Sequence, residues 1–264
     1  MKILIIGSKG YIATAFAEFA KKAKKVEKVE TASHIKLISV RDDSWRDASF
    51  VGYDVVLHTA GIAHLKETQE NQYDYYIINR DLAVDVAKKA KADGVKHFIF
   101  LSSLSVYGLV TGEITSKTVV APKTNYGRSK LAAEALIDSL ADDKFKVAIL
   151  RPPMVYGLSC PGNYSKLCRL VKTVPFFPDY PNARSLVSIE NLCSFMMEVI
   201  EKRRSGIFHP CDPVAISTSK LAVEIAKEQG RNLVLTRIFN PFISLFMPVG
   251  VVSKMFGDLV IKVP

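Results

Sequence analysis

The sequence KILIIGSKGYIA at residues 2–13 decides the fold of this chain. A short apolar run, a glycine turn and an Ala- and Phe-rich helical pattern predict the strand, turn and helix that begin a βαβ unit. Gly7 permits a tight turn, Gly10 lets the backbone approach a pyrophosphate, and Ala13 lets the helix pack closely on the strand. The Gly-x-x-Gly-x-x-Ala spacing differs from the fingerprint Gly-x-Gly-x-x-Gly, so an ordinary tight turn is the alternative.

Apolar runs alternate with amphipathic patterns from this turn to about residue 150. Continuous Val, Ile, Leu and Phe runs separated by helices are typical of a parallel sheet covered on both faces. We therefore expect an α/β fold with a Rossmann-type doubly wound parallel sheet. The predicted strands are Lys2–Ile6, Ile35–Val40, Asp54–His58, His97–Ser102 and Lys146–Leu150, and the predicted helices are Tyr11–Lys25, Tyr73–Ala92 and Tyr126–Ala141.

Prolines become dense beyond Pro152, where the pattern loosens into shorter elements. We expect residues 1–150 to form a dinucleotide-binding domain that some later segments rejoin. Residues 151–264 are expected to form mainly a small substrate-binding lobe over the carboxyl ends of the strands, where doubly wound sheets bind ligands. A chain of 264 residues is long enough for one large core with such a lobe.

A phenol and an ammonium four positions apart, Tyr126 and Lys130, stand where the third predicted helix begins. Residues at i and i+4 share one helical face, so we expect Lys130 to lie over Tyr126 and favour its phenolate. A phenol has a pKa near ~10, and a neighbouring cation lowers that pKa toward the range useful to a general base. A solvated helix face is the alternative, but an upstream strand that ends in Ser102-Ser103 favours a catalytic role.

Composition excludes several classes of protein. Hydrophobic residues make up 48% of the chain, which excludes general disorder. Only four strongly apolar residues follow Met1-Lys2 before Gly7, too few for a signal peptide. The cysteines form no Cys-x-x-Cys pair, so we expect reduced thiols in a cytoplasmic protein without a metal site. The net charge of +10 is interpreted as a solvated basic face, because no nucleic-acid motif accompanies it.

Six motifs in order resemble the extended short-chain dehydrogenase/reductases, specifically the NAD-dependent epimerase/dehydratase family. Besides the opening turn they are DVVLHTAG at 54–61, Asn79, FLSSLSVYG at 100–108, Tyr126-x-x-x-Lys130 and LRPPMVYG at 150–157. The likeness extends from Met1 to about Ile216. It implies an enzyme that acts on a nucleotide-linked sugar, with UDP as the expected nucleotide, and a homodimer formed through the second and third predicted helices.

The resemblance also implies roles for individual residues. Tyr126 would transfer a proton, Lys130 would assist it and hold the nicotinamide ribose, and Ser103 would hold the reacting sugar oxygen. The residues implied for cofactor binding are Gly7, Gly10, Tyr11, Ile12, Arg41, Asp42, Ala60, Gly61, Asn79, Tyr126, Lys130 and Pro153; those implied for substrate binding are Ser103, Ser105, Asn163 and Arg184. Some of these residues also have an interpretation without a functional role. Asn79 and Arg184 could be polar surface residues, Ala60 and Gly61 could be small only for packing, and Asn163 could cap a helix.

The choice between NAD and NADP depends on residues near the second strand. An acid about 20 residues beyond the glycine turn would bind the adenosine ribose, and Glu30 lies near that spacing. If Ile35–Val40 is the second strand, Arg41 lies where it would pair with a 2′-phosphate, and Asp42 and Asp43 remain available to the ribose or adenine. The resemblance favours NAD, with NADP as the alternative.

The reaction we expect is 4-epimerisation of a nucleotide sugar through a transient 4-keto intermediate with bound NAD. The alternatives are an NADPH-dependent 4-keto sugar reductase of surface-polysaccharide biosynthesis and a non-catalytic dinucleotide-sensing protein. Pro153-Met154 stands where galactose epimerases carry an asparagine, and TRIFNPF at 236–242 lacks their Arg-x-x-x-Asp pair. Plain UDP-galactose specificity is therefore disfavoured.

The apolar run Ile238–Val252 is interrupted by polar and proline residues and is too short for a bilayer span of ~20 residues. We expect it to form a buried helix of the lobe rather than a membrane-contacting segment. Members of the family continue beyond the position of Pro264, so a truncated C-terminus is the alternative to a complete one.

Overall fold

The computed structural model describes residues 1–27, 34–63, 65 and 67–263. Within these ranges the chain forms two compact units, each assembled from separated stretches of sequence. Unit 1 contains Met1–Gly108, Ala121–Pro152 and Ile189–Pro210. Unit 2 contains Leu109–Val120, Pro153–Ser188 and Cys211–Pro264.

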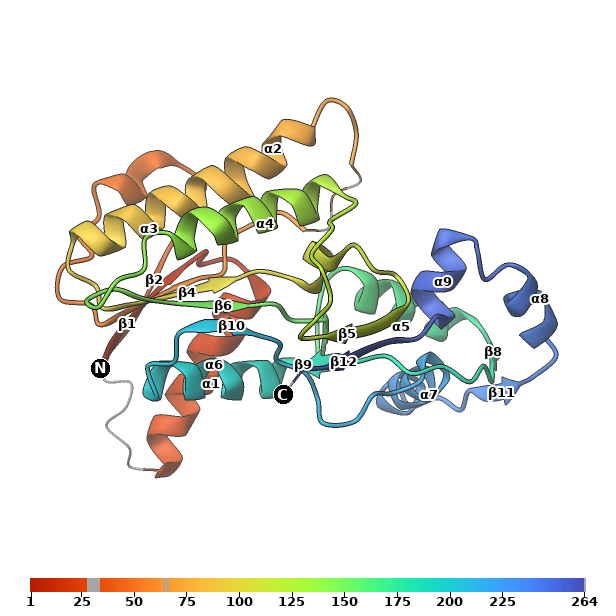
Figure 1. Ribbon diagram of the computed structural model, residues 1–264. Coiled ribbons are helices and arrows are strands. Elements are labelled where there is room, and N and C mark those ends of the chain that lie inside the picture. The colour runs from red at the N-terminus through yellow and green to blue at the C-terminus, as the bar shows by residue number, and fades with distance from the viewer. Residues whose placement is uncertain (28–33, 64, 66, 264) are drawn as a thin grey trace. The chain divides into compact units, whose positions relative to one another are not determined.

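Among the described residues, a six-stranded parallel sheet forms the centre of unit 1, in the order β10-β6-β4-β3-β1-β2 (Figure 1). Its strands are β1 (Lys2–Ile6), β2 (His34–Ile38), β3 (Val55–His58), β4 (His97–Leu101), β6 (Lys146–Leu150) and β10 (Gly206–Phe208). The order reverses at β1, which pairs with β2 on one side and β3 on the other. Ile6 pairs with His58, and His58 with Phe100, so the loops after β1, β3 and β4 leave the sheet at one edge. Doubly wound sheets bind ligands at this edge, near the strand where the order reverses.

Helices cover both faces of this sheet (Figure 1). One face carries α2 (Gln72–Tyr76), a π-helical turn at Ile77–Asp81, α3 (Leu82–Ala92) and α4 (Asn125–Asp138); the other carries α1 (Tyr11–Glu27) and α6 (Ile189–Glu201). Central strand residues such as Leu4, Val56 and Phe98 are wholly buried because neither face of the sheet is open. The burial of each such side chain stabilises the folded state by roughly 1.5–3 kcal/mol. The sheet therefore gives the loops at its edge a rigid support.

Unit 2 is built from shorter elements. β5 (Gly112–Thr115) pairs with β12 (Leu259–Lys262), β7 (Met154–Tyr156) with β9 (Leu186–Ser188), and β8 (Phe176–Pro178) with β11 (Val234–Thr236), all in parallel. Its helices are α5 (Asn163–Thr173), α7 (Thr218–Glu228), α8 (Asn240–Leu245) and α9 (Gly250–Phe256). In the part of the chain that the structure describes, no helix is long and apolar enough to cross a bilayer.

The predicted doubly wound α/β fold is confirmed. The predicted strands and helices differ from the observed ones at their ends, and the predicted helix Tyr73–Ala92 contains the π-helical turn Ile77–Asp81 in its middle. Residues 109–120, which the sequence assigned to the dinucleotide-binding part, group with unit 2 because β5 pairs with β12. Ile189–Pro210 group with unit 1 because β10 adds to the edge of its sheet. Glu30, considered for the adenosine ribose, lies outside the described residues.

The prediction of a buried helix at Ile238–Val252 is wrong. The stretch forms α8 and enters α9, and Ile243 is buried. The exposed apolar side chains of the same stretch are Ile238, Phe239, Phe242, Leu245, Phe246, Val249 and Val251. The prediction rested on the apolar composition of the run, but whether its side chains are covered depends on segments distant in the sequence.

Candidate active site

The turn between β1 and α1 requires glycine at position 7. Gly7 has a φ of +111°, and a Cβ there would lie 3.0 Å from the backbone nitrogen of Ala60. The Gly7 N–H donates to the carbonyl of Ile38 at 2.9 Å, and the Gly10 N–H donates to the carbonyl of Gly7 at 2.8 Å. Helix α1 then begins at Tyr11, followed by Ile12, with no acidic residue in its first turn. N–H groups of a first helical turn have no intrahelical acceptor, so this turn suits an anion.

Gly61, Asn79 and Lys130 converge from the β3 loop, the π-helical turn and α4. A Cβ on Gly61 would lie 2.7 Å from Asn79 Oδ1 and 3.2 Å from Lys130 Nζ. The wholly buried Asn79 accepts a hydrogen bond from the Ile62 N–H at 2.8 Å and donates to the Ile62 carbonyl at 3.0 Å. Asn79 is therefore no surface residue, and its place in a π-helical turn fits the frequent occurrence of such turns at functional sites.

Lys130 is a buried ammonium with few partners. Its Nζ donates to the Leu101 carbonyl at 2.9 Å and lies 4.7 Å from the centre of the Phe100 ring. Burial lowers the pKa of Lys130 to about 8, and the charge of Glu134 opposes that shift. A cation of this kind remains mostly protonated at neutral pH, yet it has little solvent to stabilise it.

Tyr126 is held in the first turn of α4 by contacts with its backbone. The Thr124 hydroxyl caps the helix by accepting from the Gly127 N–H at 3.1 Å. The Glu67 carboxylate accepts from the N–H groups of Asn125 and Tyr126 at 3.0 and 3.1 Å. Threonine is a favoured residue at this cap position, but the cap was not predicted from the sequence. Glu67 was missed, because nothing local links it to a helix 58 residues away.

The predicted lowering of the Tyr126 pKa by Lys130 does not occur in this structure. Burial raises the pKa of Tyr126, and a hydrogen bond with Ser103 only partly opposes the shift. The ammonium of Lys130 instead donates to the Leu101 carbonyl. The protein alone therefore keeps the phenol protonated, and a phenolate requires additional positive charge beside it.

Ser103 and Ser105 lie on the loop after β4, against the first turn of α4. The Ser103 hydroxyl accepts from the Ser105 N–H at 3.1 Å and donates to the Ser105 hydroxyl at 3.2 Å. A Cβ on Gly127 would lie 2.6 Å from the Ser105 carbonyl oxygen, so glycine allows the close approach of loop and helix. The structure thus brings together the predicted residues Ser103, Ser105 and Tyr126.

A buried polar network that the sequence did not reveal lies behind these residues. Glu134, one turn beyond Lys130, binds Arg151 through contacts of 2.6 and 3.2 Å. Arg151 also donates to the Tyr107 hydroxyl at 2.8 Å, which lies 2.7 Å from His209 Nε2. Glu134 further accepts a hydrogen bond from Ser102, which gives Ser102 a structural contact. The network ties α4 to the ends of β4 and β6.

Arg41 and Asp42 lie on the exposed loop after β2. This loop starts next to the glycine turn, because the N–H groups of Gly7 and Ser8 both donate to the Ile38 carbonyl. Hydrogen bonds from the Ser44 hydroxyl and N–H lower the pKa of Asp42, so its carboxylate already has partners. The backbone N–H of Arg41 donates to the Ser39 hydroxyl at 3.3 Å.

The remaining predicted residues, Pro153, Asn163 and Arg184, belong to unit 2. Pro153 is buried, and Asn163 is the exposed first residue of α5, where Gly162 occupies the cap position. The Arg184 guanidinium donates to the Gly257 carbonyl at 2.6 Å, and burial lowers the pKa of Arg184. Arg184 is therefore partly committed to the structure of unit 2. Among the described residues, no cluster of His, Cys, Asp and Glu could hold a metal ion.

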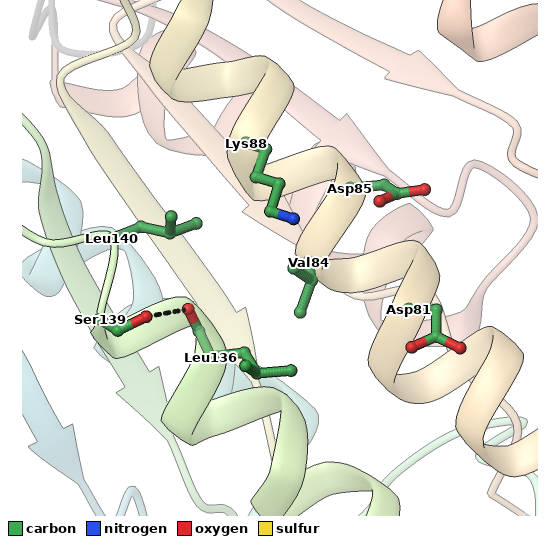
Figure 2. Close-up of a pocket in the computed structure, with 7 residues that line it drawn as sticks. All are labelled: Asp81, Val84, Asp85, Lys88, Leu136, Ser139 and Leu140. Atoms are coloured by element: carbon green, nitrogen blue, oxygen red, sulfur yellow. Dashed lines mark hydrogen bonds between the residues drawn. The ribbon is translucent and has the colours of Figure 1, made fainter.

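A hollow between α3 and α4 contains none of these residues. Figure 2 shows its lining by Asp81, Val84, Asp85, Lys88, Leu136, Ser139 and Leu140. It opens on the helical face of unit 1 rather than at the edge where the strands end. The hollow is thus separate from the candidate active site.

The chain is similar to several known proteins. A family described as the NAD dependent epimerase/dehydratase family matches residues 3–209. A UDP-glucose 4-epimerase of Vibrio cholerae is 34% identical over 224 residues, 79% of this chain and 68% of that protein. N-acetyl-alpha-D-glucosaminyl-diphospho-ditrans,octacis-undecaprenol 4-epimerase of Escherichia coli O157:H7 is 24% identical over 99% of this chain and 80% of its own length. The structure of UDP-glucuronic acid 4-epimerase from Bacillus cereus in complex with NAD has a TM-score of 0.72 at 18% identity, covering 99% of this chain and 88% of that one.

Proposed function

Because the chain belongs to the NAD-dependent epimerase/dehydratase family, we propose that it is a 4-epimerase of a nucleotide sugar and uses bound NAD. The observation that carries this proposal is the convergence of Ser103, Tyr126 and Lys130 at one edge of the sheet. The loop with Ser103 contacts the first turn of α4, and Lys130 lies one turn further along the same helix. A non-catalytic dinucleotide sensor has no need of such a set.

The residues at this edge fit a dinucleotide. Gly7 and Gly10 allow the close backbone contacts of the turn before α1, where the pyrophosphate would bind backbone N–H groups. Gly61 allows its loop to approach the side chains of Asn79 and Lys130 closely, and Lys130 would hold the nicotinamide ribose. Bound NAD supplies the hydride acceptor and donor, and its positively charged oxidised ring favours the Tyr126 phenolate.

The chemistry assigned to the chain itself is proton transfer at one oxygen. Tyr126 removes the proton of the C4 hydroxyl and returns it at the end of the cycle. Ser103 donates a hydrogen bond to the same oxygen as it becomes a carbonyl. Lys130 would hold the nicotinamide ribose of the cofactor. An epimerase requires the keto sugar to present its opposite face before it is reduced again.

The identity of the cofactor that remains after purification tests this proposal. Protein purified without added cofactor is denatured, and the released nucleotide is identified and quantified. Tightly bound NAD supports an epimerase, because the same molecule is used in both half-reactions. An empty site that binds NADPH would instead support the reductase.

The substrate proposal depends on a diphosphate. The names of the Vibrio cholerae and Escherichia coli relatives both describe a sugar joined to a diphosphate. Arg184 is the proposed diphosphate ligand, because a guanidinium binds phosphate oxygens through two parallel hydrogen bonds.

Arg184→Lys is expected to raise the KM for a nucleotide sugar roughly tenfold or more, because lysine keeps the charge but loses the bidentate geometry. Cofactor affinity, measured by fluorescence titration on the same preparation, should not change. Since Arg184 also binds the Gly257 carbonyl, the thermal unfolding of the variant is the necessary control. Parallel losses of substrate affinity, cofactor affinity and stability would mean that Arg184 only supports the fold.

The position of Arg41 favours a reductase as a second candidate function. It is exposed on the loop after β2, beside the glycine turn, where an arginine would meet a 2′-phosphate. Arg41→Ala is then expected to weaken the binding of NADPH about tenfold or more and to leave the binding of NADH unchanged, since only NADPH carries the extra phosphate. Arg46→Ala, which removes another exposed arginine of this loop, is the control. Equal affinities before and after Arg41→Ala would remove the case for NADP.

We also propose a homodimer formed through the helical face of unit 1 that carries α2, α3 and α4. Tyr73 of α2, Ile77 of the π-helical turn and Leu136 of α4 are large exposed apolar side chains on this face. The hollow in Figure 2 lies between α3 and α4 on this face. The mass in solution, measured by light scattering, decides between a monomer and a dimer.

A further inference from the structure

Seven large apolar side chains that the structure exposes lie between residues 238 and 251. They are Ile238, Phe239, Phe242, Leu245, Phe246, Val249 and Val251. The exposed fractions of Ile238, Phe242 and Leu245 are 71%, 62% and 71%. Scattered apolar residues on a surface need no explanation, but a contiguous group of this kind marks a site of interaction. We refer to residues 237–257 as the apolar segment.

The apolar segment is fixed to unit 2 by its inner side. Ile243 is buried, and the Asn240 amide donates to the Asp179 carbonyl at 2.9 Å. At the end of the segment, the buried Phe256 packs against the rings of Phe177 and Tyr180, with centroids 6.0 and 5.7 Å away. The exposed side chains are therefore not an unfolded end of the chain.

The outward side of α8 is apolar. Phe242 and Leu245 lie three residues apart in this helix, and the Phe246 N–H donates to the Phe242 carbonyl at 2.9 Å. Residues at i and i+3 share a helical face, so the exposed side chains of Phe242 and Leu245 project together. Phenylalanine and leucine are typical of the apolar face of helices that lie in a membrane interface.

The apolar segment contains cations but no acidic residue of its own. From Gln229 to Gly257 the sequence contains Arg231, Arg237 and Lys254 and neither aspartate nor glutamate. Arg237 forms an exposed ion pair with Asp179 at 3.0 Å, and Lys254 is exposed on α9. The net charge of +10 of the whole chain also favours its approach to an anionic surface.

We propose that the apolar segment contacts the surface of an anionic phospholipid bilayer, with its phenylalanine and leucine side chains in the headgroup boundary. The segment lies on the membrane without crossing it, as expected of an amphipathic face with neighbouring cations. A second copy of the chain is a poorer partner. A two-fold interface sets the same patch against itself, which would bring cations together with no acid in the segment to pair with them. The contact is independent of the proposed reaction.

Co-sedimentation of the purified chain with vesicles tests the contact. We expect binding to vesicles that contain phosphatidylglycerol, weaker binding to phosphatidylcholine alone, and a decrease with added salt. The double substitution Phe242→Ser and Leu245→Ser is expected to lower the partition coefficient at least about tenfold, because two large apolar side chains no longer leave water. Lys254→Gln should weaken binding only to the anionic vesicles.

Val119→Ser and Val214→Ser are the matched controls. Both valines are 78% exposed in unit 2 and lie outside the apolar segment, so these substitutions should leave vesicle binding unchanged. Retained cofactor and normal turnover in the Phe242/Leu245 variant show that it is folded. The proposal is overturned if the unmodified chain stays in the supernatant with anionic vesicles, or if the controls weaken binding equally. It is also overturned if light scattering shows that the double substitution converts a dimer to a monomer, because the segment would then bind a second copy.

Discussion

Tyr126→Phe is expected to lower the turnover of a nucleotide sugar by at least ~10²-fold, which is typical of the loss of a positioned acid–base group. Only one hydroxyl is removed, so the fold and the cofactor affinity should remain nearly unchanged. Because burial raises the pKa of Tyr126 in the protein alone, the phenolate would form only beside added positive charge. Initial rates, together with a fluorescence titration of cofactor, measure both quantities.

Tyr73→Phe is the matched control for this experiment. Tyr73 lies in α2 and is 68% exposed, so losing its hydroxyl should change neither rate nor affinity. Near-normal turnover in Tyr126→Phe would eliminate the proposed proton transfer. A loss of cofactor binding equal to the loss of turnover would instead assign Tyr126 to the cofactor site.

Glu134→Ala is expected to lower the free energy of unfolding by about 3–5 kcal/mol, because it leaves the guanidinium of Arg151 buried without its counter-charge. Both side chains are less than one-tenth exposed, and they meet at 2.6 Å. Urea unfolding followed by circular dichroism measures the change. Glu198→Ala is the control. Glu198 forms solvent-exposed ion pairs with Lys202 and Arg204, so its removal should have little effect on the free energy of unfolding.

The double substitution Glu134→Ala and Arg151→Met distinguishes charge from packing. Removing both charges should recover part of the stability, because an apolar side chain of similar length has no desolvation cost. If Glu134→Ala has no more effect than Glu198→Ala, the network does not stabilise α4. Its position behind Lys130 would then need another explanation.

The parts of the structure that the sequence predicted are those set by local patterns. The strands are uninterrupted apolar runs in the sequence because both faces of the sheet are covered. The turn after β1 needs a positive φ, which favours glycine, so Gly7 marked its position in the sequence. Tyr126 and Lys130 were found because their spacing places them on one helical face. The burial of Asn79 could not be predicted from the sequence, because a polar residue in a helical pattern looks the same whether or not a distant loop covers it.

Contacts between distant segments account for what was missed. Glu67 binds the first turn of α4, and Glu134 of α4 binds Arg151, which directly follows β6. Neither contact produces a recognisable pattern in the sequence around these residues. The pKa of Tyr126 was predicted from its distance in sequence to Lys130, whereas burial dominates it. The apolar segment was expected to be buried because its composition is apolar, but composition does not show which segments pack against it.

The most direct test of the proposed function is to incubate the purified chain with UDP-glucose and with UDP-N-acetylglucosamine and to follow the sugar by NMR. We expect at least one of the two to be converted to its C4 epimer, with no added cofactor and no net change in absorbance from reduced nicotinamide. Tyr126→Phe should form the same product at least ~10²-fold more slowly. Turnover of a 4-keto sugar that consumes one NADPH for each product, with no epimer formed from either nucleotide sugar, would contradict it.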